Sequence, residues 1–218
     1  MSKTIRVVGD VHGKFDAFKA IVEASPHPVV QIGDLGIGFG NKEGESILVD
    51  LDFAFIRGNH DHPAKCRLMR QYIDGDLTVM DNLHSEAIEL ADLFMAIPGA
   101  ASIDKDERTP GVNWWPDEEM TVAEMATYAR WVNQVKPPVI LSHTAPHHVA
   151  QMAFKYNVPF HSRTGAFLDL LFEIHQPKLW VFGDHHKHLD TEWRGTRFIG
   201  LGELEYGDIV DGEWVWPT

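Results

Sequence analysis

Side chains that can bind metal ions recur in this sequence of 218 residues, each time directly after a short apolar run typical of a β-strand. The first group, Gly9-Asp10-Val11-His12-Gly13, places a carboxylate and an imidazole two residues apart, so that both can turn toward one point. Such repetition predicts a site assembled from loops at strand ends. Oxygen and imidazole ligands without thiolates suit Mn, Fe, Zn or Ni. The later groups are Gly33-Asp34, Gly58-Asn59-His60-Asp61, Ser142-His143 and Gly183-Asp184-His185-His186.

The number of candidate ligands is sufficient for a pair of metal ions. Two ions about 3.5–4 Å apart need a bridging carboxylate and about three further protein ligands each. A single Gly-Asp pair after a strand is usually a turn, so the prediction depends on the ordered set. The count is right if Asp34 is the bridge. The seven candidate ligands are Asp10, His12, Asp34, Asn59, His143, Asp184 and His186.

The ordered series GDVHG, GD, GNHD, SH and G-x-x-H, which spans residues 9–186, resembles the calcineurin-like metallophosphoesterase superfamily. The resemblance implies a metal-dependent hydrolase of phosphomonoesters or phosphodiesters, in which a metal-bound hydroxide attacks phosphorus. It also implies two divalent transition-metal ions, with Mn as the first choice and Fe, Zn or Ni as alternatives. By motif position, one ion would bind Asp10, His12, Asp34 and His186, and the other would bind Asp34, Asn59, His143 and Asp184.

One position departs from the pattern of the superfamily, whose fourth motif is usually Gly-His-x-His. Asp184 stands where the first histidine of that motif is expected. An aspartate has a similar reach, adds a negative charge and favours harder ions such as Mn over Zn. A second register, in which His186 and His188 supply the histidine pair, keeps His-x-His but loses the glycine. Both registers remain open at this point.

The motif at residues 57–61 also carries candidate catalytic groups. His60 directly follows the candidate ligand Asn59, so it is expected beside the metals without binding them. The resemblance implies that His60 is a general acid or stabilises the phosphoryl transition state, which an imidazole can do near neutral pH, and that Asn59 helps to hold the phosphoryl oxygens. Arg57 could contact a phosphate oxygen or serve the scaffold. Asp61 could orient His60 or cap the next helix.

The polar segment at about 100–120 is expected to form a loop or cap beside the site, because long structured loops are often functional. Its Trp115, together with Trp114, could stack on a nucleobase, although most tryptophans pack in cores. Arg108 and Arg163 are candidate partners for an anionic substrate. A nucleotide or a phosphoprotein would both suit these groups.

The elements that must position these residues alternate between strands and helices. The stretch 5–32 reads as strand, helix and strand, and a right-handed βαβ unit would place Asp10 and Asp34 at the same edge of a parallel sheet. The alternation predicts two packed sheets flanked by helices, and the resemblance implies an α/β fold of two mixed sheets in one domain, 1–218. Further strands are expected at 53–56, 139–141 and 179–182, an antiparallel meander at 77–97, a C-terminal hairpin region at 197–216, and helices at 14–24, 63–72, 121–136 and 164–175.

Composition limits the partners and the compartment. The chain has 32 acidic and 19 basic residues, a formal charge of −13, which disfavours stable binding to duplex DNA because such binding needs many cationic contacts. No apolar run approaches the roughly 18 residues of a membrane helix. The N-terminus leads straight into the first strand, which argues against a signal peptide. Cys66 is the only cysteine, so a cytoplasmic location without an intrachain disulfide is predicted.

A catalytically silent relative that serves as an interaction scaffold is the rival hypothesis from another class. Such a protein would be expected to lose metal ligands or the residue equivalent to His60. This chain keeps His60, and its one departure still offers a carboxylate. The enzyme is therefore the preferred interpretation.

Overall fold

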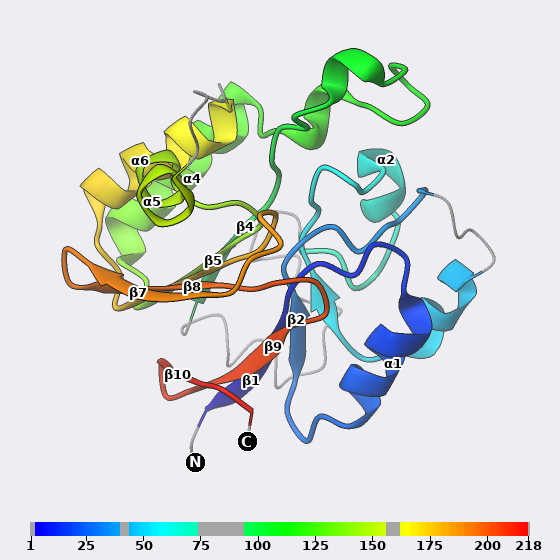
Figure 1. Ribbon diagram of the computed structural model, residues 1–218, viewed down its shortest axis with the longest axis horizontal. Helices are drawn as coiled ribbons and strands as arrows, with labels where there is room; N and C mark the ends of the chain where they lie inside the picture. The colour runs from blue at the N-terminus through cyan, green and yellow to red at the C-terminus, as the bar shows by residue number, and fades with distance from the viewer. Residues whose placement is uncertain (1–2, 40–43, 74–93, 156–161, 218) are drawn as a thin grey trace.

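Two five-stranded mixed sheets pack face to face, with helices on both outer sides, as predicted (Figure 1). The computed structural model describes residues 3–39, 44–73, 94–155 and 162–217. The first sheet has the order β10-β9-β1-β2-β3 and the second has the order β4-β5-β6-β8-β7. The first sheet contains β1 (Thr4–Val8), β2 (Val29–Gln31), β3 (Ala54–Phe55), β9 (Tyr206–Val210) and β10 (Glu213–Val215). The second contains β4 (Phe94–Ile97), β5 (Val139–Ser142), β6 (Leu179–Phe182), β7 (Leu189–Trp193) and β8 (Thr196–Gly200).

Helices cover the outer face of each sheet, so the molecule has four layers (Figure 1). The first sheet packs against α1 (Phe15–Glu23), the 3-10 helix η1 (Gly44–Asp50) and α2 (Pro63–Cys66). The second sheet packs against α4 (Val122–Val135), α5 (His147–Phe154) and α6 (Arg163–Ile174). Short 3-10 helices, η3 (Lys105–Glu107) and η4 (Pro116–Glu118), lie in the segment between β4 and α4.

Burial on both faces explains why the central strands are apolar throughout. Along β5, Val139 and Leu141 face the core between the sheets, whereas Ile140 packs with the helices of the outer layer. All three side chains are fully buried. Complete burial of such a side chain contributes about 1.5–3 kcal/mol. This packing holds the strand ends, and hence the residues that follow them, in one rigid frame.

The predicted βαβ unit is confirmed. β1 pairs in parallel with β2, with Val7 opposite Val30, and β2 in turn pairs in parallel with β3. In the second sheet β4, β5, β6 and β8 run parallel to one another, and the edge strand β7 is antiparallel to β8. The carboxyl ends of these strands therefore lie together at one edge of each sheet, which is where open α/β sheets form ligand-binding crevices.

A capping box begins α4, in the helix expected at 121–136. The Glu124 backbone N–H donates to Thr121 Oγ1 at 3.2 Å, and the Thr121 backbone N–H donates to Glu124 Oε2 at 2.6 Å. Tyr128 and Val132 are the buried residues of this helix, whereas its apolar Val122 and Val135 are mostly exposed. The buried face is narrow because the helix lies at the surface.

Several predicted elements were wrong in extent or pairing. α2 ends at Cys66 rather than continuing to residue 72, and residues 94–97 form a strand parallel to β5 rather than part of an antiparallel meander. The rest of that meander prediction lies outside the described residues. Residues 196–200 and 206–215 belong to different sheets, so they do not form a single hairpin.

The helix α5 was missed because its two turns after Pro146 are too short to show a clear periodicity. Within the described ranges, no helix combines the length and the apolar character needed to cross a membrane.

Candidate active site

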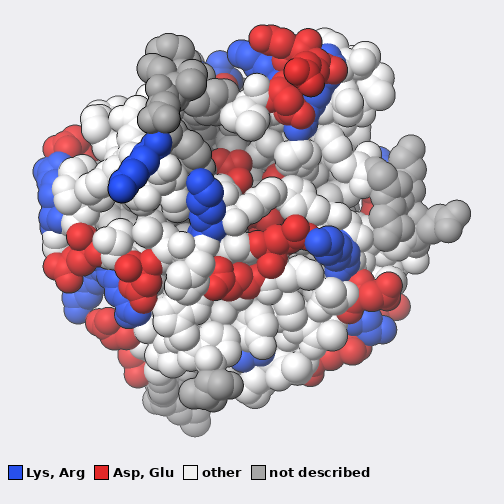
Figure 2. Space-filling model, in the orientation of Figure 1, with Lys and Arg blue, Asp and Glu red and all other residues white. Residues whose placement is uncertain are grey.

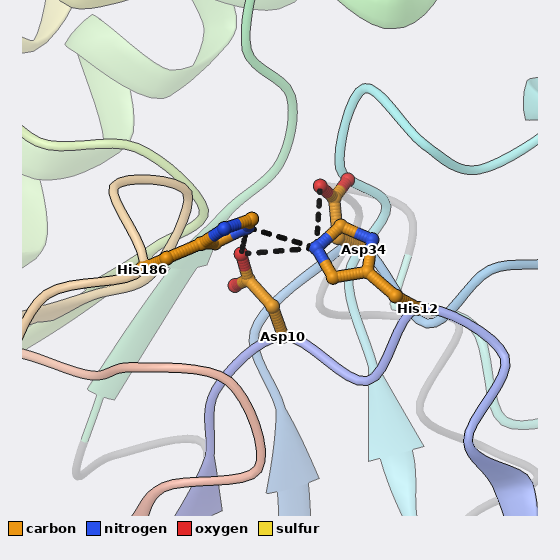
Figure 3. A group of neighbouring side chains, drawn as sticks. All are labelled: Asp10, His12, Asp34 and His186. Atoms are coloured by element: carbon orange, nitrogen blue, oxygen red, sulfur yellow. Dashed lines mark hydrogen bonds and ion pairs between the residues drawn. The ribbon is translucent and has the colours of Figure 1, made fainter.

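Four of the predicted ligands converge in what we call the first group: Asp10, His12, Asp34 and His186. One donor atom from each lies within 4.8 Å of all the others, and Figure 3 shows the His12 ring between Asp34 and the pair formed by Asp10 and His186. His186 Nε2 lies 2.9 Å from Asp10 Oδ2 and 2.8 Å from His12 Nε2. These residues come from the ends of β1, β2 and β6, so the strand-end prediction brings them together.

The other predicted ligands form a second group around His143, which is fully buried. His143 Nε2 lies 3.3 Å from Asp34 Oδ1, 3.2 Å from Asn59 Oδ1 and 3.8 Å from Asp184 Oδ1. Asp34 belongs to both groups, because its Oδ2 lies 3.8 Å from His12 Nε2. The structure therefore brings all seven predicted residues together at one edge of the sandwich.

The donor set fits divalent cations. Asp10 Oδ2 is buried and has no partner with hydrogen-bond geometry among the described residues, although His186 Nε2 is near, and a buried charge without a partner is costly unless a metal ion binds it. His143 donates through Nδ1–H to the Ile32 carbonyl oxygen at 2.9 Å. This bond directs the Nε2 atom toward the oxygen atoms of Asp34, Asn59 and Asp184, which is the orientation that a metal-ligating histidine needs.

Burial and mutual repulsion disturb the titration of these groups. Burial raises the pKa of Asp10 to about 6, with the neighbouring charges of Asp34 and Asp184 adding to the effect and the contact with His186 opposing it. Burial opposes the charged form of His143, but the carboxylates around it outweigh burial and raise its pKa well above the usual value. The excess of negative charge in the cluster thus attracts cations.

The backbone at four of the seven ligands is unusual for residues other than glycine. His12, Asp34, Asp184 and His186 have φ angles of 49°, 57°, 63° and 49°, in the left-handed region. Each such residue costs on the order of 1–3 kcal/mol and persists only where the surrounding structure holds it. This strain at four of the ligands indicates that the surrounding structure holds them in place.

Glycines in the motifs permit the close approach of the ligands. A Cβ atom at Gly58 would lie 2.1 Å from Asp34 Oδ1, and one at Gly183 would lie 2.3 Å from Asp10 Oδ1. Any larger residue would displace a ligand. This explains why a glycine precedes Asn59 and Asp184 in the sequence motifs.

Two residues whose supporting roles were missed from sequence hold the ligand loops. Asp61 neither orients His60 nor caps α2: it is fully buried and accepts backbone N–H groups from Leu35, Gly36, Ile37 and Gly58. Gln31 at the end of β2 bonds to Gly9 O at 3.1 Å and accepts the Gly33 N–H at 3.1 Å. A polar residue at the end of an apolar strand, as in Val29-Val30-Gln31, is the signal that could have revealed Gln31.

His60 lies beside the first group, as expected, and contacts one of the candidate substrate residues. Its Nδ1 is 2.8 Å from Asp34 Oδ2 and its Nε2 is 2.6 Å from an Arg108 guanidinium nitrogen. Because guanidinium only donates and carboxylate only accepts, Nδ1 carries the proton in this arrangement. Burial lowers the pKa of His60, but the hydrogen bond and the charge of Asp34 outweigh it and raise the pKa overall.

His60 and Arg108 line a cavity of about 590 Å³ that opens from the ligand cluster. Its lining includes ligands of both groups together with residues that follow β5 or lie on α5 and α6. The volume is within the range of small-molecule sites, about 300–1,000 Å³. Lining residues include Asn59, Asp184, Ala101, Ala145, Ala150, His147, Gln151 and Gly165.

Arg57, which sequence left between phosphate contact and scaffold, lies away from the cavity. Its side chain is fully buried, and it donates to Asp117 O at 3.1 Å and to Tyr72 Oη at 3.0 Å. The bond to Asp117 ties the segment after β3 to the segment before α4, and the bond to Tyr72 ties it to the segment after α2. The placement favours the scaffold interpretation over direct contact with phosphate.

Two further candidates for substrate contact also lie outside the cavity lining. The Trp115 ring packs against His62, with 4.4 Å between ring centroids, and against Phe39. Arg163 donates through Nε to Met120 O at 3.1 Å. Arg108 is thus the one candidate substrate residue of the three that the structure brings to the cavity.

The alternative register for the last motif does not agree with the structure. His188 is mostly exposed, its Nδ1 lies 2.5 Å from Glu205 Oε1, and its ring packs against Trp216. Asp184, in contrast, faces His143 within the second group. The donor near the second group is therefore the aspartate.

Comparisons with known proteins agree with this arrangement. A sequence model of the calcineurin-like phosphoesterase family matches residues 3–188. A putative 5′-nucleotidase from Staphylococcus aureus, solved in complex with alpha-ketoglutarate, is similar in fold, with a TM-score of 0.58 and 13% identity over 96% of this chain. This chain spans about half of that protein, 51%.

A phosphopantetheinyl hydrolase from Mycobacterium tuberculosis has a TM-score of 0.45 and 14% identity, covering 92% of this chain and 90% of its own. This likeness is too weak to support an argument. A comparison with curated proteins yielded no significant match. The family match over most of the chain shows that it belongs to the calcineurin-like phosphoesterase family.

Proposed function

We propose that the protein is a dinuclear metal-dependent phosphoesterase. The position of Asp34 carries this proposal, because its two carboxylate oxygens face different groups of ligands. Oδ2 is directed toward His12 of the first group, at 3.8 Å, and Oδ1 is directed toward His143 of the second, at 3.3 Å. A carboxylate shared in this way is the element that a pair of ions requires.

The residues of the chain have distinct parts in this proposal. When bound, the two ions supply Lewis-acid charge and lower the pKa of water, so that a nucleophile is available near neutral pH. Arg108 donates to a phosphoryl oxygen in place of His60 Nε2, which its guanidinium contacts at 2.6 Å. That exchange frees Nε2 of His60, and Asp34 remains bonded to its Nδ1. His60 can then take up a proton and deliver it to the leaving oxygen.

Manganese is the ion that we propose first. The second group offers carboxylate, amide and imidazole donors, with Asp184 adding a negative charge where a histidine is usual in the family. Hard oxygen donors suit Mn, whereas a second imidazole would favour Fe, Ni or Zn. Fe, Zn and Ni remain alternatives for the test.

The substrate that we propose is a small-molecule phosphoester of about nucleotide size. The cavity beside the ligands has a volume of about 590 Å³, which suits a leaving group that is enclosed rather than one on the surface of a folded phosphoprotein. The net charge of −13 disfavours duplex nucleic acid. On the face of the molecule that Figure 2 shows, the Lys and Arg side chains form only separate small groups.

An activity screen of the metal-loaded protein tests the proposal. Metal-free protein is loaded with Mn, Fe, Ni or Zn and assayed with chromogenic phosphomonoesters and phosphodiesters, followed by nucleotides and a phosphopeptide. We expect hydrolysis that depends on metal and is abolished by Asp34→Asn. Absence of hydrolysis with every metal and ester would favour the interaction-scaffold hypothesis.

A further inference from the structure

The amide of Asn59 must present its oxygen, rather than its nitrogen, to bind a cation in the second group. Asn59 is 5% exposed, its Oδ1 lies 3.2 Å from His143 Nε2 and its Nδ2 lies 3.2 Å from Ser102 Oγ. The two ends of an amide have nearly the same shape, so packing alone does not decide which end faces the metal. The hydrogen-bond partner of the other end must decide.

Ser102 could not select the orientation by itself, because a hydroxyl group both donates and accepts. Its Oγ, however, also lies 3.0 Å from Glu118 Oε2. A carboxylate only accepts, so the single Ser102 proton points at Glu118. The Ser102 oxygen is left as an acceptor, and only the NH₂ end of Asn59 can satisfy it.

Glu118 is held as the acceptor that this argument needs. Its Oε1 accepts the Ser102 backbone N–H at 2.8 Å and the Trp114 Nε1–H at 3.0 Å, and the side chain is almost completely buried. Together with the Ser102 hydroxyl, three donors surround one carboxylate. A neutral group with its own N–H would leave a buried donor facing donors, which costs about 1–3 kcal/mol.

We propose that Glu118 and Ser102 are positioning residues that hold the Asn59 amide with its oxygen toward the second metal. The pair lies in the segment between β4 and α4, on the same segment as Arg108, so this segment would support both the metal site and the substrate cavity. The inference rests on the proposed function, since it takes the second group as a metal site.

Calorimetric titration of metal-free protein with Mn²⁺ alone tests the pair. For Ser102→Ala and Glu118→Gln we expect roughly 10–100-fold weaker binding of the second ion, the usual effect of removing a partner of a metal ligand, and an unchanged first ion. Glu119→Gln is the matched control. Its carboxylate accepts from Ser162 Oγ and the Thr164 backbone N–H, and its hydrogen bonds within the described part of the chain do not involve Asn59 or Ser102. It should bind both ions as the wild type does.

A second background separates positioning from a merely structural role. With Asn59→Asp both ends of the side chain are oxygens, so no orientation has to be selected. The amide introduced by Glu118→Gln could then donate a hydrogen bond to Ser102 Oγ. The Ser102 hydroxyl would in turn donate to the carboxylate introduced at position 59. The loss of second-ion affinity caused by Glu118→Gln should therefore disappear or reverse in the Asn59→Asp background, as a double-mutant cycle would measure.

The outcomes separate the two proposals. The positioning proposal would be overturned by equal losses of second-ion affinity in both backgrounds or by unchanged binding of the second ion to Ser102→Ala. It would also be overturned by a wild-type protein that binds no second ion. A wild-type protein that binds two ions but hydrolyses no phosphoester would overturn the proposed function and leave the positioning intact.

Discussion

The substitution Asp61→Asn tests how the fold holds the ligand loops. Asp61 accepts two backbone N–H groups at Oδ1, from Gly36 at 2.7 Å and Ile37 at 3.0 Å. It accepts two more at Oδ2, from Leu35 at 3.2 Å and Gly58 at 2.9 Å. An asparagine keeps one oxygen and turns an NH₂ group toward two N–H donors. It thus preserves the shape of the side chain while removing half of its acceptors.

The expected cost follows from these contacts. Hydrogen bonds to a charged group contribute about 1.5–3 kcal/mol each, so the loss of two should cost about 3–6 kcal/mol of the free energy of unfolding. In a domain of this size each kcal/mol lowers the melting temperature by about 2–4 °C, which gives a decrease of about 6–24 °C. Metal affinity should also fall, because the same loops carry Asp34 and Asn59.

Thermal unfolding of the metal-free protein measures this effect, and Mn²⁺ titration measures the affinity. Asp52→Asn is the matched control, since Asp52 is exposed between η1 and β3 and should tolerate the change. A decrease in melting temperature no larger than that of the control would refute the reasoning. It would mean that the four N–H groups find other partners when the carboxylate is lost.

Three further predictions concern residues of the site and its scaffold. His60→Ala should lower turnover by roughly 10²–10⁴-fold with unchanged metal content, and loss of metal on elemental analysis would contradict the proposed role. Asp184→His should keep two ions but shift the activating metal from Mn toward Zn, Ni or Fe, whereas His188→Ala should leave metal content unchanged; the opposite pattern would restore the alternative register. Arg57→Met should remove the two hydrogen bonds that the guanidinium donates to Asp117 O and Tyr72 Oη and lower the free energy of unfolding by about 3–6 kcal/mol, with KM unchanged; a raised KM at normal stability would indicate phosphate contact instead.

Local patterns accounted for the parts of the fold that depend on neighbours in sequence. The strand–helix–strand unit before Asp34 was predictable because parallel strands joined by one helix have a single favoured hand. The cap at Thr121 was predictable because its partner is three residues away. The pairing of β4 with β5 and of β8 with β6 was not predictable, since apolar strands of similar length do not indicate which strands they will pair with.

The sequence by itself determined the seven candidate ligands, because each needs only a short motif after a strand. Tertiary structure decided how they are used. It placed Asp34 between two groups of donors, chose Asp184 over His188, and buried Arg57 in the scaffold while bringing Arg108 to His60. Each choice depends on side chains that meet across dozens of residues, and such meetings follow from the packing of the two sheets rather than from spacing along the chain.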